Sequence, residues 1–343
     1  MKALLLSEYK KLELADLPVP QPRADELLVR VRACGICGSD VHGYDGSTGR
    51  RLPPIVMGHE AAGIVEAVGS SVSGFKPGDR VTFDSTIYCG ECYFCRRGEV
   101  NLCDNREVLG VSTPLFRRHG AFAEYVAVPA RVSYVLPDAL PFEHAAMIEA
   151  VSVAVHAVSL APIAKEDTVV VIGAGMIGLL TLQAARAAGA QRVMVADMDP
   201  SRLEMAEKMG AWITVNSRES DVVQQVATET AGRGADLAIE CVGVTATVKL
   251  AVDCVRKGGA VTLVGNVTPT VELPLQAVVS RQIRLQGSCA SSGEYPRCME
   301  LMASGAIQVA PLISQVAPLA DGVQWFERLY AGEPGLLKVV LQP

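Results

Sequence analysis

Four cysteines in the first third of the chain are spaced like the ligands of a metal site. Cys89, Cys92, Cys95 and Cys103 are separated by two, two and seven residues. Four thiolates in one short loop match a closed tetrahedral zinc site, in which no coordination position is left for a substrate. A ferredoxin-type iron–sulfur cluster has a shorter gap before its last cysteine, which argues against that alternative. The spacing therefore predicts a structural zinc ion.

A second group of metal-binding residue types is dispersed along the chain and consists of Cys37, His59, Glu60 and Glu149. One thiolate, one imidazole and one or two carboxylates make a mixed ligand set with room for an exchangeable oxygen, as a catalytic zinc requires. Spacing alone does not bring these residues together. Taken singly, His59 is as readily interpreted as a buried core histidine, and Glu149 as a surface carboxylate.

A glycine-rich motif, Gly173-Ala174-Gly175-Met176-Ile177-Gly178, follows an apolar stretch typical of a buried strand and opens a helical pattern. In this context the three glycines permit a tight turn, close approach of a pyrophosphate and close packing of helix on strand. Backbone amides at the start of the helix, together with its dipole, then bind phosphate. The expected cofactor contacts are Gly173, Gly175, Met176, Ile177 and Gly178.

An acidic residue, Asp197, lies 19 positions after Gly178, at the end of the next expected strand. A carboxylate there accepts a hydrogen bond from a ribose 2′-hydroxyl and repels a 2′-phosphate, so the sequence predicts NAD rather than NADP. The alternative is a helix-capping role, because Asp199 stands close by. Arg202 is a candidate contact for a 2′-phosphate or, alternatively, a residue on a solvated helix face.

The elements that must position these residues fall into two regions. Residues 1 to about 150 contain short alternating or β-branched runs separated by Gly and Pro, which favours a small barrel or sandwich. After residue 165, apolar runs alternate with stretches of helical period, which predicts a parallel sheet covered on both faces. The expected strands are 169–172, 193–196, 213–215, 237–239, 261–264 and 337–341, and the expected helices are 176–188, 202–209, 222–230, 247–256 and 295–304.

Bulk properties limit the function classes. The chain has 343 residues, enough for two domains, and half of them are apolar. A formal net charge of −6 argues against nucleic acid, whose binding proteins carry basic faces. We see neither a signal peptide nor an apolar stretch long enough to span a membrane. Ten cysteines without a secretory signal indicate a reducing compartment, and we expect a cytoplasmic protein.

Several motifs together resemble the zinc-containing medium-chain dehydrogenase/reductase family, nearly from end to end. They are Gly35-Ile36-Cys37-Gly38-Ser39-Asp40, Gly58-His59-Glu60, Gly78-Asp79-Arg80-Val81, the four cysteines, Gly120-Ala121-Phe122-Ala123-Glu124-Tyr125 and the glycine turn. The resemblance implies a GroES-like β-barrel catalytic domain in residues 1–150, to which 290–343 return. It implies a Rossmann NAD-binding domain, a doubly wound parallel sheet, in 151–289, with the active cleft between the two domains.

By the same resemblance Cys37 and His59 bind a catalytic zinc, and Glu60 is a direct or an exchanging ligand. Glu149 stands where the polyol branch of the family has a glutamate. That branch commonly has Pro after it, and Ala150 here leaves its coordination open. Asp40 is expected to orient the ring of His59. The implied cofactors are two Zn²⁺ per chain and NAD.

The implied reaction is hydride transfer from a small-molecule alcohol to NAD. Ser39 is the expected first acceptor of the alcohol proton and His42 the terminal shuttle, because an imidazole titrates near neutral pH. The alternatives are that Ser39 only bonds to backbone and that His42 is a surface histidine.

The family likeness favours a polyol or sugar alcohol, phosphorylated or not, with threonine or another vicinal amino alcohol as the alternative substrate. Arg50-Arg51 and Arg117-Arg118-His119 are candidate contacts for a substrate phosphate; otherwise they are solvated. The resemblance also implies a homodimer or homotetramer. Two readings from other classes are a catalytically silent NAD-binding redox sensor and a zinc-ribbon nucleic-acid module.

Overall fold

The computed structural model describes residues 1–343 and divides the chain into two compact units. The first comprises Met1–Glu149, Tyr295–Glu300 and Val309–Pro343, and the second comprises Ala150–Glu294 and Leu301–Gln308. Residues 290–294 and 301–308 thus group with the second unit, whereas the sequence analysis expected all of 290–343 in the first domain. For residues 301–308 the amide of Gln183 explains the difference, because it donates to Gln308 O (3.2 Å) and accepts from Gln308 N (2.7 Å).

The first unit is built mainly from antiparallel strands. Its largest sheet has seven strands in the order β12-β6-β5-β3-β20-β19, with β11 also paired to β3, and a three-stranded sheet has the order β2-β1-β4. The strands are β1 (Lys2–Glu8), β2 (Lys11–Asp16), β3 (Glu26–Gly35), β4 (Ile55–Val56), β5 (Glu60–Val68), β6 (Arg80–Phe83), β7 (Thr86–Ile87), β8 (Glu107–Val108), β9 (Val111–Ser112), β10 (Arg117–Arg118), β11 (Tyr125–Pro129), β12 (Ser133–Val135), β19 (Ile313–Pro318) and β20 (Lys338–Gln342).

Short helices complete the first unit and include α1, which carries several of the expected site residues. The helices are α1 (Gly38–Gly43), α2 (Tyr93–Arg96), α3 (Phe142–Ala145), α10 (Tyr295–Ala303), which continues into the second unit, and α11 (Gly322–Tyr330). Apolar side chains from both ends of the chain share one core: Phe122 and Phe326 meet edge to face with ring centroids 6.3 Å apart. The last strand, β20, pairs with β3 through Val340–Gly35 and Leu341–Cys34.

The second unit has one six-stranded parallel sheet in the order β15-β14-β13-β16-β17-β18. This is the strand order of a doubly wound Rossmann fold, in which ligands bind at the carboxyl ends of the central strands. The strands are β13 (Thr168–Ile172), β14 (Arg192–Asp197), β15 (Ile213–Asn216), β16 (Ala235–Glu240), β17 (Val255–Leu263) and β18 (Arg284–Gly287). The expectation of a parallel sheet in this region is confirmed.

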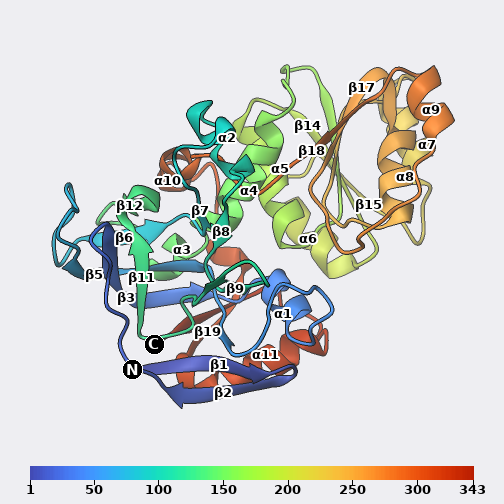
Figure 1. Cartoon of the computed structure of the whole chain (residues 1–343). Helices are drawn as coiled ribbons and strands as arrows, with labels where there is room; N and C mark the ends of the chain where they lie inside the picture. Colours follow the sequence, from blue (N-terminus) through green and yellow to red (C-terminus); the bar gives the residue numbers. More distant parts are fainter. The chain divides into compact units, whose positions relative to one another are not determined.

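Helices cover both faces of this sheet, with α5 and α6 on one side and α7 and α8 on the other (Figure 1). The helices are α4 (Ile148–Ser159), which begins in the first unit, α5 (Met176–Ala187), α6 (Pro200–Lys208), α7 (Val222–Glu229), α8 (Thr245–Cys254) and α9 (Leu275–Ser280). Helix α6 begins as the sequence predicts, because Asp199 accepts a hydrogen bond from Ser201 N (2.9 Å) and Pro200 occupies the first turn. No helix of the chain is both long and apolar enough to cross a bilayer.

Candidate functional site

The first unit brings three of the dispersed metal-binding residues together. One donor atom each from Cys37, His59 and Glu60 lies within 4.8 Å of the other two. The antiparallel pairing of β3 with β5 produces this arrangement, since it places Gly35 opposite Glu60. Ligands of a tetrahedral zinc lie roughly 3.5 Å apart, given zinc–ligand bonds of about 2.0–2.3 Å. The trio therefore fits a zinc ion after small shifts of the side chains.

Two glycines shape the backbone of this cluster. Gly58 has a φ of +91°, and a Cβ there would lie 2.7 Å from the ring of Phe122, so only glycine fits the turn that presents His59. A Cβ on Gly35 would lie 2.4 Å from Oε2 of Glu60. Gly58 thus leaves space for Phe122 behind the turn, and Gly35 leaves space for the carboxylate of Glu60.

Glu60 forms a buried ion pair that sequence reasoning did not find. Lys338, the first residue of β20, places its Nζ 2.6 Å from Oε2 of Glu60 and also donates to Ile36 O (3.0 Å). Burial opposes the charged lysine, but Glu60, Cys37 and Glu149 together outweigh burial, so the pKa of Lys338 is raised. The available signal was a single lysine in an apolar run, Leu336-Leu337-Lys338-Val339-Val340-Leu341.

Asp40 lies behind the ring of His59, where the family resemblance places it. Its Oδ1 is 3.3 Å from Nδ1 of His59 and 2.9 Å from a guanidinium nitrogen of Arg51, and its Oδ2 accepts from Cys37 N (3.4 Å). Burial raises the pKa of Asp40, but His59 and Arg51 together overcome this and hold it well below its ordinary value. Nδ1 of His59 thus faces a carboxylate, and Nε2 faces the Cys37 side.

The surroundings of His59 Nδ1 also fit an imidazole that binds a metal through Nε2. This buried nitrogen has no well-aligned hydrogen bond, although Asp40 is at ion-pair distance. A histidine that binds zinc through one nitrogen normally donates its other N–H to a carboxylate, and a small rotation of the ring would complete that bond.

The two expected proton-relay residues differ in their surroundings. Ser39 Oγ lies 3.4 Å from Cys37 Sγ and 3.4 Å from Nε2 of His59, so the hydroxyl is beside the cluster. His42 is exposed in the last turn of α1, and its imidazole has no hydrogen bond or ion pair in this structure. The structure therefore places Ser39 beside the cluster, and proton transfer through Ser39 and His42 stays a prediction.

Glu149 lies near the trio without belonging to it. It is half-buried in the first turn of α4, where Ser85 Oγ donates to its Oε1 (3.3 Å). Burial raises the pKa of Glu149 to about 7; Glu60 and Asp84 add to this, and His59 and Lys338 act against it. Direct coordination of zinc by Glu149 stays a prediction.

A second donor cluster lies in residues 89–103, called the four-cysteine lobe below. The Sγ atoms of Cys89, Cys92, Cys95 and Cys103 all lie within 4.8 Å of one another. Backbone amides point at the sulfurs; Cys89 N, for example, donates to Cys103 Sγ (3.2 Å). Hydrogen bonds from the amides of Glu91 and Cys92 lower the pKa of Cys89 to about 6, whereas burial raises the pKa of Cys95 to about 12. This donor set fits a closed zinc site.

The second unit carries the glycine turn at the carboxyl end of β13. A Cβ on Gly178 would lie 1.7 Å from the carbonyl oxygen of Gly173, so α5 approaches the turn as closely as backbone allows. Gly175 is the N-cap of α5, and Met176 and Ile177 begin the helix. This leaves the first amides of the helix available for a pyrophosphate.

Asp197 ends β14 and holds the turn together. Its Oδ2 accepts from Ala174 N (2.6 Å), and its Oδ1 accepts from Met198 N (2.7 Å) and Asp199 N (2.9 Å). Asp199, not Asp197, caps α6. The exposed Arg202 lies 3.7 Å from the Asp199 carboxylate, so it interacts with its own helix cap.

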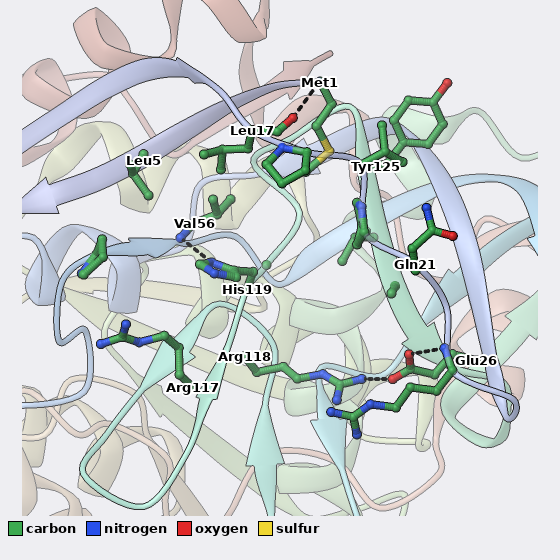
Figure 2. Close-up of a pocket in the computed structure, with 18 residues that line it drawn as sticks. Met1, Leu5, Leu17, Gln21, Glu26, Val56, Arg117, Arg118, His119 and Tyr125 are labelled. Carbon is green, nitrogen blue, oxygen red and sulfur yellow. Dashed lines mark hydrogen bonds and ion pairs between the residues drawn. The ribbon is translucent and has the colours of Figure 1, made fainter.

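The candidate phosphate-binding arginines differ in burial: Arg50 and Arg117 are exposed, Arg118 is half-buried and Arg51 is buried. Arg51 is buried against Asp40, so it is neither solvated nor free for a substrate phosphate. Arg118 pairs with Glu26 and Glu107. Arg117 and Arg118 line a separate pocket of about 550 Å³, and none of the zinc donors is among its lining residues. Figure 2 shows Arg118 directed at Glu26 and His119 at the backbone nitrogen of Val56.

Comparison with known proteins identifies both halves of the chain. The family model for the alcohol dehydrogenase GroES-like domain matches residues 23–138, and that for the zinc-binding dehydrogenase matches residues 177–304. Sorbitol dehydrogenase of Bacillus subtilis (strain 168) is 36% identical over 348 residues, covering 100% of this chain and 97% of that protein.

Solved structures extend the likeness to three dimensions. Galactitol-1-phosphate dehydrogenase from Escherichia coli is 30% identical, with 100% of both chains covered and a TM-score of 0.92. A protein of Sinorhizobium meliloti 1021, described as a zinc-binding dehydrogenase and bound to NADP, is 36% identical, with 100% of this chain and 99% of that chain covered and a TM-score of 0.91.

Proposed function

This chain belongs to the zinc-dependent medium-chain dehydrogenase family, and on that premise we propose that it oxidises a secondary alcohol of a polyol or sugar alcohol. The single observation that carries the proposal is the Cys37–His59–Glu60 trio, in which a mixed donor set is supported by buried charges of both signs. The sorbitol and galactitol-1-phosphate dehydrogenases among its relatives favour polyhydroxylated substrates.

Different residues of the first unit would bind the zinc, accept the alcohol proton and orient the zinc ligands. Cys37 and His59 would hold the zinc, with Glu60 or Glu149 as a further ligand. A zinc ion bound there supplies a Lewis acid that lowers the pKa of an alcohol toward neutrality. Ser39, whose hydroxyl is beside the trio, would accept the alcohol proton as it passes its own hydroxyl proton on toward solvent. Asp40 would keep His59 in the tautomer that leaves Nε2 free.

We further propose NAD as the hydride acceptor. The glycine turn would bind the pyrophosphate, and Asp197 would bind the ribose through the outer lone pairs of its carboxylate. Asp197 is a fixed negative charge beside the turn, which disfavours a 2′-phosphate, and Arg202 interacts with Asp199. The relative bound to NADP makes NADP the necessary comparison in any assay.

The test is a spectrophotometric screen for reduced nicotinamide with sorbitol, galactitol, their phosphates and L-threonine, each with NAD and with NADP. We expect turnover of a polyol with NAD, together with about two zinc ions per chain. Preference for L-threonine would favour the amino-alcohol alternative. Binding of NAD without turnover of any substrate would favour a redox sensor and contradict the proposal.

We also propose a cytoplasmic homodimer or homotetramer. Strand β18 lies at the edge of the parallel sheet, and α9 beside it exposes Leu275 (63%) and Val279 (69%). An open strand edge next to apolar side chains favours pairing with a second copy. The ten free cysteines suit a reducing compartment. Light scattering of the wild type and Val279→Glu tests the assembly; a monomeric wild type would contradict it.

A further inference from the structure

Arg51 is a buried arginine beside the candidate catalytic site. It is 3% exposed, whereas its neighbour Arg50 is on the surface. A Cβ on Gly43 would lie 2.4 Å from Cγ of Arg51, so the absence of a side chain at Gly43 makes room for it. The backbone of Arg51 also forms an isolated β-bridge with Ser112. The fold therefore encloses this guanidinium in one place.

The guanidinium faces the carboxylate of Asp40. Two of its nitrogens, Nη2 at 2.9 Å and Nε at 3.3 Å, donate to the same oxygen that faces His59. A zinc-bound histidine is a neutral imidazole, so in the loaded site it cannot balance the charge of Asp40. Arg51 is then the counter-ion of Asp40, as Lys338 is the counter-ion of Glu60.

The same guanidinium also contacts the expected proton acceptor. Nη2 of Arg51 donates to Ser39 Oγ (3.4 Å). Arginine has donors only, so this contact occupies a lone pair of the serine oxygen and turns the serine O–H away from Arg51. The other groups within reach of that hydroxyl are Cys37 Sγ and Nε2 of His59, both at 3.4 Å.

We propose that Arg51 is a positioning residue of this site: it compensates Asp40 behind the zinc-binding histidine and orients the hydroxyl of Ser39. The inference rests on the proposed zinc-dependent function. It assigns two consequences to one side chain, namely retention of the zinc ion through Asp40 and His59, and proton transfer through Ser39. These consequences can be separated by substitution.

The first measurement is zinc retention. Purified wild type, Arg51→Met, Arg51→Lys and the surface control Arg50→Met are exposed to a colorimetric chelator, and zinc release is followed over time. We expect the wild type and Arg50→Met to hold two ions, and Arg51→Met to lose one of them with about 10- to 100-fold weaker retention. Arg51→Lys keeps a cation at Asp40 and is expected to retain both. The second ion, in the four-cysteine lobe, reports that each variant is folded.

The second measurement is turnover in H₂O and D₂O. Nε and Nη2 of Arg51 both bond Asp40, and this rigid planar fork directs Nη2 at Ser39 as well. Lysine lacks the fork, so its ammonium is not held toward Ser39. We therefore expect Arg51→Lys to keep its KM and to lose about tenfold or more in kcat, with a larger solvent isotope effect. A loss of packing alone would not change the isotope effect. If Arg51→Met loses both ions by unfolding, the kcat and the isotope effect of Arg51→Lys test the role of Arg51.

The outcomes separate this inference from the proposed function. A wild type with one zinc ion and no turnover overturns both. A wild type with two ions and full turnover, combined with Arg51→Met and Arg51→Lys variants that match it in zinc retention, kcat and isotope effect, overturns the role of Arg51 alone.

Discussion

The two donor clusters of the first unit differ in their ligand types, in their burial and in how far apart in the sequence their ligands lie. The four-cysteine lobe takes all its donors from residues 89–103, uses one type of ligand and is half-exposed. The trio of Cys37, His59 and Glu60 combines three ligand types, and two buried ion pairs support it. A local all-thiolate set suits a metal that holds a loop together. A dispersed mixed set that depends on distant strands suits a metal that must stay reactive.

The largest expected effect tests whether turnover depends on the trio and not on the four-cysteine lobe. Replacing Cys37 by Ala should lower kcat/KM on the order of a thousandfold, because electrostatic stabilisation of developing charge is usually the largest catalytic contribution. One of two zinc ions should be lost, while the melting temperature changes by about 2 °C or less. Steady-state kinetics, metal analysis and a thermal melt measure this. Full turnover of Cys37→Ala would remove the trio from the mechanism.

The next effect concerns the ion pair behind the trio. Replacing Lys338 by Met leaves Glu60 charged and unpaired in the interior, which should cost about 3–5 kcal/mol of unfolding free energy. The double variant Lys338→Met/Glu60→Gln removes the uncompensated charge and should recover most of that loss. Urea unfolding of both variants measures it. Equal stability of the single variant and the wild type would show that Glu60 does not need Lys338.

A smaller effect is expected in the lobe. Replacing Cys95 by Ser removes one of four thiolates, so the lobe zinc should be lost and the melting temperature should fall by roughly 5–10 °C. Because this site has no open coordination position, kcat/KM at a temperature well below the melt should remain within about tenfold of the wild type. A thousandfold loss of turnover without unfolding would contradict the structural assignment.

The smallest effect depends on pH. In the zinc-free protein the pKa of Glu149 is raised by burial from 4.5 to about 7. Between pH 4.5 and about pH 7 Glu149 is ionised in the unfolded state but still protonated in the folded state. The free energy of unfolding therefore falls as the pH rises through this range, and the full loss is reached above about pH 7. Glu149→Gln should stabilise the chelated protein at about pH 8 by on the order of 1–3 kcal/mol, and should change nothing at about pH 4.

Denaturant titrations at both pH values, with the exposed Glu13→Gln as a control, measure this difference. An equal gain at both pH values would mean that the amide acts through packing and not through charge. A gain that persists with zinc bound would argue against any contact between Glu149 and the metal.

Much of the second unit could be predicted from the sequence because its signals are local. The apolar runs at 169–172 and 193–196 are strands, and the Asp199-Pro200 helix start is where capping chemistry places it. Strand β18 and helix α9 were not predicted. Their residues are half-buried or exposed, so they lack the apolar period that marks a core element.

The candidate site was predictable only in part. The spacing of the four cysteines predicts their site, and the family motifs predict the site of Cys37 and His59. Lys338 and Arg51 belong to no such motif, and Lys338 stands out only as a single lysine in an apolar run. Their partners, Glu60 and Asp40, are set by strand pairing and loop packing. The sequence suggested a phosphate contact or a solvated residue for Arg51, and both are wrong because burial of a charge is decided by its neighbours in space.

The Glu60–Lys338 pair joins residues 278 positions apart. Closing so long a loop is entropically costly and therefore comes late in folding. The lobe can close around an ion as soon as its fifteen or so residues are available, because short loops form fastest. The two metals are thus expected to enter in sequence during maturation, first the one that secures the lobe and then the one that makes the protein active. A chain interrupted before β20 would capture the first ion without becoming competent for the second.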